Sequence, residues 1–171
     1  RLKPSKQLAD ALSSMLKGNK EFILLDDQKV VYETAIAMAK KAQNGKKHVL
    51  IVEGGPGTGK SVVAINLLVN LTNIGIASQY VSKNSEPRKV YTAKLTGNFK
   101  KTYINNLFTG SGCFIDAPND TYGALIVDEA HRLNEKSGLY GNVGENQIHE
   151  IIKAAKFSVF FVDDRQRIHV K

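Results

Sequence analysis

The sequence predicts an α/β fold, in which a parallel β-sheet is flanked by helices on both faces. Segments typical of strands and of helices alternate along the chain. The strand segments are continuous apolar runs, as in strands that are buried on both faces of a parallel sheet. A glycine-rich stretch, Gly54 to Ser61, lies between an apolar strand segment and an apolar helix segment. These observations favour a nucleotide-binding α/β domain.

The size and composition fit one soluble domain with a sizeable core. The chain has 171 residues, of which 42% are hydrophobic and 23% are charged. No apolar run approaches the ~20 residues of a membrane helix, and residues 1–20 lack the apolar core of a signal peptide. The single cysteine, Cys113, excludes an internal disulfide. We therefore expect a cytoplasmic protein without a membrane partner.

The net charge of +8 favours anionic partners, nucleic acid among them. The basic residues are spread along the chain rather than clustered. An ordinary lysine-rich surface therefore explains the charge as well, and the charge alone favours nucleic acid only modestly.

Residues 1–44 are expected to form an N-terminal helical segment that packs on a core lobe, residues 45–171. Apolar residues at helical spacing predict a short helix within residues 5–17. Asp26 and Asp27 are candidate N-caps for a second helix over residues 27–43. Asn44 and Gly45 end that helix.

The core lobe is expected to contain four strands. They are placed at 48–53, 76–82, 124–127 and 157–162, with helices at 60–73, 87–95, 99–108 and 145–156 and loops at 109–120 and 132–144. Polar clusters follow three of these strands. Because ligands bind at the carboxyl ends of parallel strands, these clusters are expected to form one site.

The glycine-rich stretch matches the phosphate-binding pattern G-x-x-x-x-G-K-[ST] through Gly54, Gly59, Lys60 and Ser61. Glycines let successive backbone N–H groups point into one concavity, and the following helix adds the positive end of its dipole. The residues expected to bind the nucleotide are Gly55, Pro56, Gly57, Thr58, Gly59, Lys60 and Ser61. Lys60 would meet the β- and γ-phosphates, and the Ser61 hydroxyl would bind Mg²⁺.

Asp128 and Glu129 follow the apolar strand Ala124 to Val127. A carboxylate at this position can bind the same Mg²⁺ as Ser61, directly or through water. Glu129 can accept a proton from an attacking water, which is the role of a general base. Lys60, Asp128 and Glu129 are therefore catalytic candidates, and the acidic pair favours hydrolysis of ATP.

Two of these stretches resemble motifs I and II of the superfamily 1 and 2 helicases: Gly54 to Ser61 and Asp128-Glu129-Ala130-His131. Asp163-Asp164-Arg165-Gln166 resembles motif III, although Asp163 stands where a glycine is usual. Over residues 20–170 the chain is similar to bacterial P-loop proteins with a Schlafen group 3-like DNA/RNA helicase domain. The similarity also rests on Ser82-Lys83-Asn84-Ser85 and on Phe160 to Ile168.

This resemblance implies the first RecA-like lobe of a helicase-type ATPase that uses Mg²⁺ and ATP and binds single-stranded DNA or RNA. It implies that Gln166 senses the γ-phosphate and that Gln28 reads the adenine edge, although Gln28 is equally compatible with an exposed helix residue. Lys83 and Asn84 would contact the phosphodiester backbone, and an ordinary polar loop fits them as well. The second RecA-like lobe is expected to lie outside these 171 residues, so the lobe is expected to hydrolyse ATP slowly.

Two other readings compete with the helicase-type ATPase. In the first, the chain is a nucleotide-controlled binding module, a switch that does not translocate on nucleic acid. In the second, it is a P-loop kinase that transfers phosphate to a small molecule. Glu129 and Gln166 argue against the kinase, since a kinase has no use for an activated water.

Overall fold

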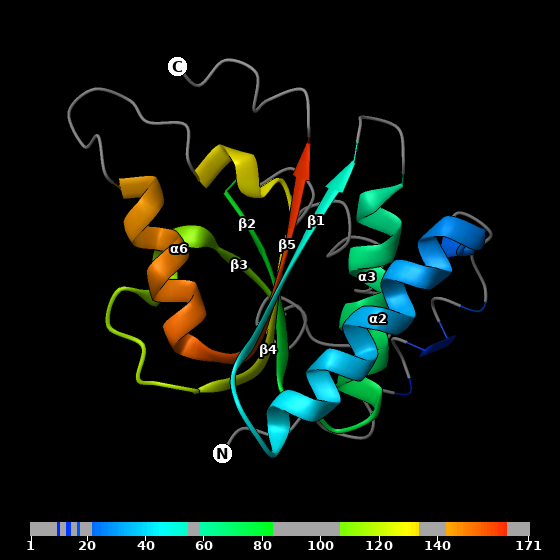
Figure 1. Cartoon of the computed structure of the whole chain (residues 1–171), viewed down its shortest axis with the longest axis horizontal. Coiled ribbons are helices and arrows are strands. Elements are labelled where there is room, and N and C mark those ends of the chain that lie inside the picture. The colour runs from blue at the N-terminus through cyan, green and yellow to red at the C-terminus, as the bar shows by residue number, and fades with distance from the viewer. Residues whose placement is uncertain are drawn as a thin grey trace.

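The computed structural model describes residues 22–54, 59–83, 107–133 and 143–163, together with residues 10, 13, 14 and 17. Five of its strands form one sheet in the order β1-β5-β4-β2-β3, and each neighbouring pair is parallel (Figure 1). Their bounds are β1 His48–Gly54, β2 Ser78–Ser82, β3 Phe108–Gly110, β4 Tyr122–Val127 and β5 Ala155–Asp163. The predicted α/β class with a parallel sheet is confirmed.

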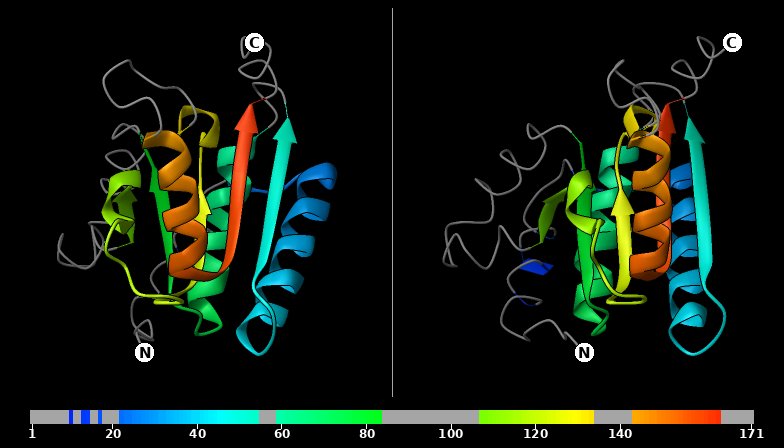
Figure 2. Two further views of the ribbon diagram at one scale, coloured as in Figure 1. Left: turned by 60° about the vertical axis from the view of Figure 1, so that its left-hand side comes forward. Right: turned by 90° about the vertical axis from the view of Figure 1, so that its left-hand side faces the viewer.

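Helices cover both faces of the sheet (Figure 2). Helices α2 (Asp26–Gln43) and α3 (Lys60–Asn73) pack on one face. Helix α6 (Val143–Ala154) and the short 3₁₀ helices η2 (Ser111–Phe114) and η3 (Ala130–Leu133) pack on the other. The sheet is therefore the middle of three layers, and its parallel strands all end at one edge.

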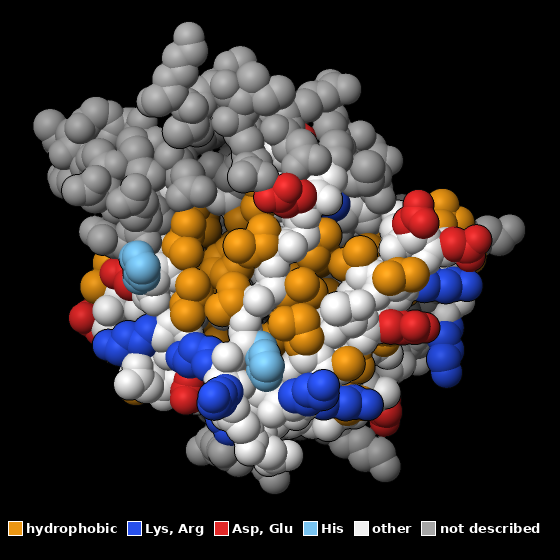
Figure 3. All heavy atoms as spheres, viewed as in Figure 1, with side chains coloured by type: hydrophobic (Ala, Val, Ile, Leu, Met, Phe, Trp, Pro, Cys, Tyr) orange, Lys and Arg blue, Asp and Glu red, His pale blue; other side chains and the backbone are white. Residues whose placement is uncertain are grey.

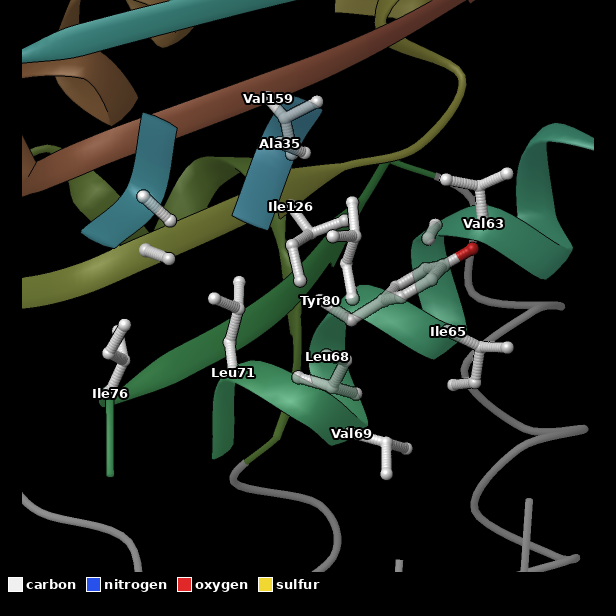
Figure 4. Close-up of a cluster of buried hydrophobic side chains, with 14 of the residues drawn as sticks. Ala35, Val63, Ile65, Leu68, Val69, Leu71, Ile76, Tyr80, Ile126 and Val159 are labelled. Carbon is white, nitrogen blue, oxygen red and sulfur yellow. The ribbon is translucent and has the colours of Figure 1, made fainter. Parts of the chain in front are cut away.

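The larger core lies between the sheet and helices α2 and α3 (Figure 4). Nine of the fourteen residues of α3 are buried, which explains why that helix is apolar on nearly all sides. Helix α2 contributes only alanines to its fully buried face: Ala35, Ala39 and Ala42. Small side chains let α2 approach closely, while each buried Leu or Ile of α3 contributes roughly 1.5–3 kcal/mol.

Strand β1 lies at one edge of the described sheet and is only half covered. Its residues alternate between partly buried and exposed positions, and the exposed ones include Val49 (38% exposed) and Ile51 (61%). Figure 3 shows hydrophobic side chains gathered at the centre of this face of the molecule. The strand that leads into the glycine-rich stretch thus keeps an uncovered apolar side.

Most predicted elements lie within two residues of the observed ones, including α2, β1, α3, β2, β4 and β5. Two predictions were wrong. Phe108 begins β3 rather than ending a helix, and the predicted loop 109–120 contains part of β3 and the helix η2. Helix α6 is also within two residues of its predicted bounds: it starts at Val143, inside the predicted loop 132–144, and ends at Ala154 because the backbone pairs with Tyr122 from Ala155 onward. The predicted helix 87–95 lies outside the described residues.

The division of the chain at residue 44 stays a prediction. Among the described residues, no helix is both long enough and apolar enough to span a bilayer.

Candidate nucleotide site

The candidate site lies at the carboxyl edge of the sheet, towards which the strand arrows of β1 and β5 point in Figure 1. Gly54 ends β1, Lys60 starts α3, and Asp128 directly follows β4. The backbone N–H of Asp128 donates to the Val81 carbonyl at 2.9 Å, which ties the start of this turn to β2. Residues far apart in sequence therefore meet where parallel strands place ligands.

Ser61 and Asp128 form the centre of this site. The Ser61 hydroxyl donates to Oδ2 of Asp128 at 3.0 Å, and Asp128 is only 3% exposed. A hydroxyl and a carboxylate are hard oxygen donors of the kind that Mg²⁺ prefers. The hydroxyl oxygen keeps lone pairs for a metal ion while its proton points to Oδ2 of Asp128. The donor set of this pair therefore fits Mg²⁺.

Glu129 occupies a strained position beside Asp128. Its φ is +49°, in the left-handed region that costs a non-glycine residue of order 1–3 kcal/mol. Its backbone N–H donates to Oδ1 of Asp128 at 2.9 Å, and its own Oε2 atom is buried. Such strain persists only where the surroundings impose it, and it is frequent at functional sites.

The end of the glycine-rich stretch has the backbone expected from the phosphate-binding pattern. Gly59 has a φ of +76° and is the N-cap of α3, where the N–H groups of Val62 and Val63 both point to its carbonyl. The Lys60 ammonium donates to the Gly54 carbonyl at 3.0 Å, so its side chain reaches the end of β1. Gly55, Pro56, Gly57 and Thr58 lie outside the described residues.

Gln28 lies against the loop rather than on an exposed helix face. Its Oε1 accepts the Leu25 backbone N–H at 2.8 Å, which caps the start of α2. A Cβ built on Gly59 would lie 1.8 Å from Nε2 of Gln28, so the amide is packed on the glycine backbone. The position is next to the candidate nucleotide site, and contact with adenine stays a prediction.

The remaining predicted residues are placed only in part. Lys83 is exposed and directly follows β2, whereas Ser82 is completely buried. Of these two residues only Lys83 is accessible to a phosphodiester backbone. Asn84 and Gln166 lie outside the described residues.

Tyr80 was missed by the sequence analysis. Its hydroxyl donates to Oδ2 of Asp128, the same atom that Ser61 binds, and its side chain is completely buried. The available signal was a polar atom inside an apolar strand, since a buried hydroxyl requires a partner. The sequence does not show that β2 pairs with β4, and that pairing supplies the partner.

The comparisons with known proteins identify the family. The model of the family described as Schlafen group 3, DNA/RNA helicase domain matches residues 47–171. The chain belongs to this family. The match spans every strand of the sheet and the residues of the candidate site from Gly54 onward. It confirms the resemblance that the motifs had indicated and agrees with a RecA-like lobe.

Searches of curated proteins and of solved structures gave no further information on function. The search of curated proteins gave no match to this chain. A solved structure described as "Structural Basis for Katanin Self-Assembly" is similar to 95% of this chain, with 14% sequence identity and a TM-score of 0.41. This chain spans 54% of that chain. At this TM-score the similarity carries no argument about function.

Proposed function

We propose that this chain is the ATP-binding lobe of a helicase-like, nucleic-acid-dependent ATPase. The observation that carries the proposal is the pairing of Ser61 with the buried Asp128, directly beside the strained Glu129. Membership of a DNA/RNA helicase domain family supports nucleic acid as the partner. The exposed Lys83 at the end of β2 and the net charge of +8 are consistent with contacts to phosphates.

Each residue of the site has a role in this proposal. The backbone that turns at Gly59 presents N–H groups to the phosphates, and Lys60 adds a positive charge beside them. Ser61 and Asp128 would hold Mg²⁺, which neutralises charge on the β- and γ-phosphates when it is bound. Glu129 accepts the proton of the attacking water, and Gln166 reports the γ-phosphate. Gln28 reads the adenine edge from its place beside Gly59.

Turnover by these residues alone is expected to be slow. In helicases of this type, arginines from a second RecA-like lobe stabilise the charge that develops during phosphoryl transfer. In related systems such arginines contribute about 10³–10⁵ in rate. The second lobe and a single strand of DNA or RNA are therefore the partners that the proposal requires.

The test is the ATPase rate of the chain with Mg²⁺, measured with and without single-stranded DNA or RNA. We expect slow release of phosphate that one of these strands stimulates. Glu129→Gln should lower the rate at least about 100-fold without weakening ATP binding, since it removes the general base alone. Lys60→Ala should weaken ATP binding about tenfold or more, because a hydrogen bond to a charged group is lost. Glu33→Gln, an exposed Glu of α2, is the matched control and should change neither quantity.

Normal hydrolysis by Glu129→Gln would contradict the general-base assignment. ATP binding and slow hydrolysis without stimulation by either strand would favour the nucleotide-controlled switch over the helicase-like motor. A requirement for an added small-molecule acceptor before any ADP forms would instead favour a kinase.

A further inference from the structure

Tyr80 is a polar residue at the centre of an apolar core. Its side chain is completely buried, and Figure 4 shows its ring lying among the aliphatic side chains of α3 and β4. The ring packs on Phe108 of β3, with centroids 5.5 Å apart and an interplanar angle of 48°. A buried phenol is costly unless its hydroxyl is hydrogen-bonded. In this core the partner of that hydroxyl is Asp128.

The bond from Tyr80 completes a defined set of donors around Asp128. Oδ2 accepts the hydroxyls of Tyr80 and Ser61, and Oδ1 accepts the backbone N–H of Glu129. An ionised carboxylate has roughly four acceptor sites. Three of them are thus used by protein groups in the described structure, which leaves about one for a ligand.

The backbone around Tyr80 keeps its hydroxyl in place. Strand β2 pairs with β4 so that Tyr80 lies opposite Ile126, and the Tyr80 N–H donates to the Leu107 carbonyl at 2.7 Å. The Asp128 N–H in turn donates to the Val81 carbonyl. A main-chain bond and a side-chain bond therefore join the end of β2 to the same aspartate.

We propose that Tyr80 is a positioning residue for the cation-binding carboxylate of Asp128. Its hydroxyl fixes the rotation of the carboxylate, so that the remaining acceptor site serves the water shell of a divalent cation held by Ser61. This inference rests on the proposed function, because it assigns Ser61 and Asp128 to Mg²⁺. It adds strand β2 to helix α3 and strand β4, the elements that carry Ser61 and Asp128.

The experiment is a titration of MgCl₂ into the 171-residue protein with a fluorescent ADP analogue. Tyr80→Phe keeps the ring and removes only the hydroxyl. For Tyr80→Phe we expect the nucleotide affinity measured in EDTA to be unchanged. The Mg²⁺ concentration that gives half-maximal enhancement of nucleotide binding should rise about tenfold, because one hydrogen bond to a charged group contributes about that factor. Tyr122→Phe is the control, since Tyr122 is a half-buried tyrosine near the opposite end of β4. It should leave the Mg²⁺ midpoint unchanged.

A further variant keeps the test decisive if Tyr80→Phe does not fold. Installing 4-fluorophenylalanine at position 80 fills the space of the tyrosine without providing a donor, and 4-aminophenylalanine restores a donor. The midpoint should rise with the first and return towards the wild-type value with the second. A purely structural role predicts a change in unfolding free energy alone, so an unchanged midpoint in a folded donor-free variant would overturn the inference. If the wild-type protein shows no Mg²⁺-dependent nucleotide binding, the proposed function itself fails, and this inference fails with it.

Discussion

The two turns that flank strand β4 use the same unusual backbone for different purposes. Asp120 precedes the strand with a φ of +54°, and Glu129 follows it with a φ of +49°. Within the described part of the chain they are the non-glycine residues with positive φ. Asp120 lies at the amino edge of the sheet and Glu129 at the carboxyl edge, so the pair compares the two ends of one fold.

At the amino edge the polar groups neutralise one another. Lys47 forms an ion pair with Asp120 at 2.9 Å, and its ammonium also donates to the carbonyls of Ile152 and Lys153 at the end of α6. The Asp120 N–H donates to the Lys153 carbonyl as well. A cation at a helix C-terminus is favourable, and Asp tolerates the left-handed region better than most residues do. These contacts explain the left-handed backbone at Asp120 as a feature that stabilises the fold.

At the carboxyl edge the central group is the buried carboxylate of Asp128. The bonds that Asp128 accepts in the described structure come from two hydroxyls and one backbone N–H, all of them neutral. A buried carboxylate costs stability unless it is well hydrogen-bonded or paired. Glu tolerates the left-handed region less well than Asp does. Under the proposed function, the strain and the buried charge at this edge serve a bound nucleotide and its cation, whereas the contacts at the amino edge stabilise the fold.

The largest effect is expected for Gly59→Ala, at the carboxyl edge. An alanine at this position would have to adopt a φ of +76°, which strains its backbone. Its Cβ would also lie 1.8 Å from Nε2 of Gln28. We expect a loss of about 1–3 kcal/mol in unfolding free energy, together with weaker binding of nucleotide. Chemical denaturation and a nucleotide titration measure the two effects.

The double variant Gly59→Ala/Gln28→Ala separates the two causes of that loss. Removing the Gln28 amide relieves the contact but not the backbone strain, so the double variant should recover part of the stability. If it is no more stable than Gly59→Ala, the close packing of Gln28 on the loop is not what limits this position.

A smaller and purely structural effect is expected for Lys47→Met, at the amino edge. The Lys47 side chain is 32% exposed and that of Asp120 is 45% exposed, so solvent screens the ion pair. The carbonyls of α6 lose their donor, and we expect a loss of about 1 kcal/mol in unfolding free energy. Nucleotide affinity should not change.

Lys46→Met is the matched control for Lys47→Met, because Lys46 is exposed and adjacent in sequence. It should leave the unfolding free energy within about 0.5 kcal/mol of the wild-type value. Weaker nucleotide binding by Lys47→Met at unchanged stability would break the distinction between the two edges.

The strands and the residues at the carboxyl edge were largely predictable from the sequence. Apolar runs placed β1, β4 and β5, because continuous burial in a parallel sheet leaves a continuous hydrophobic signal. The glycine pattern placed Gly59, Lys60 and Ser61 at the start of α3, because a fixed spacing encodes a local turn. Asp128 was recognised by its place at the end of an apolar strand.

Features that depend on strand order could not be predicted. Tyr80 contacts Asp128 because β2 pairs with β4, and local sequence does not specify which strands are neighbours. Strand β3 has three residues, too few for periodicity to distinguish it from a loop. The Lys47–Asp120 pair likewise joins residues that only the folded sheet brings together.

The sharpest test of the comparison is the smallest in magnitude, Glu129→Gly. Glycine adopts a φ of +49° without the penalty of about 1–2 kcal/mol that Glu pays, but it loses about 0.5–1 kcal/mol through its more flexible unfolded chain. The variant should therefore gain about 0.5 kcal/mol in unfolding free energy while losing hydrolysis. Asp120→Gly relieves the same strain but gives up the ion pair with Lys47, so it should gain nothing. A gain at both positions, or at Asp120 alone, would show that the strain at Glu129 is not specific to the site. A gain at Glu129 alone would show that the backbone strain that costs stability lies at the carboxyl edge. The loss of hydrolysis is expected in any case from the missing carboxylate.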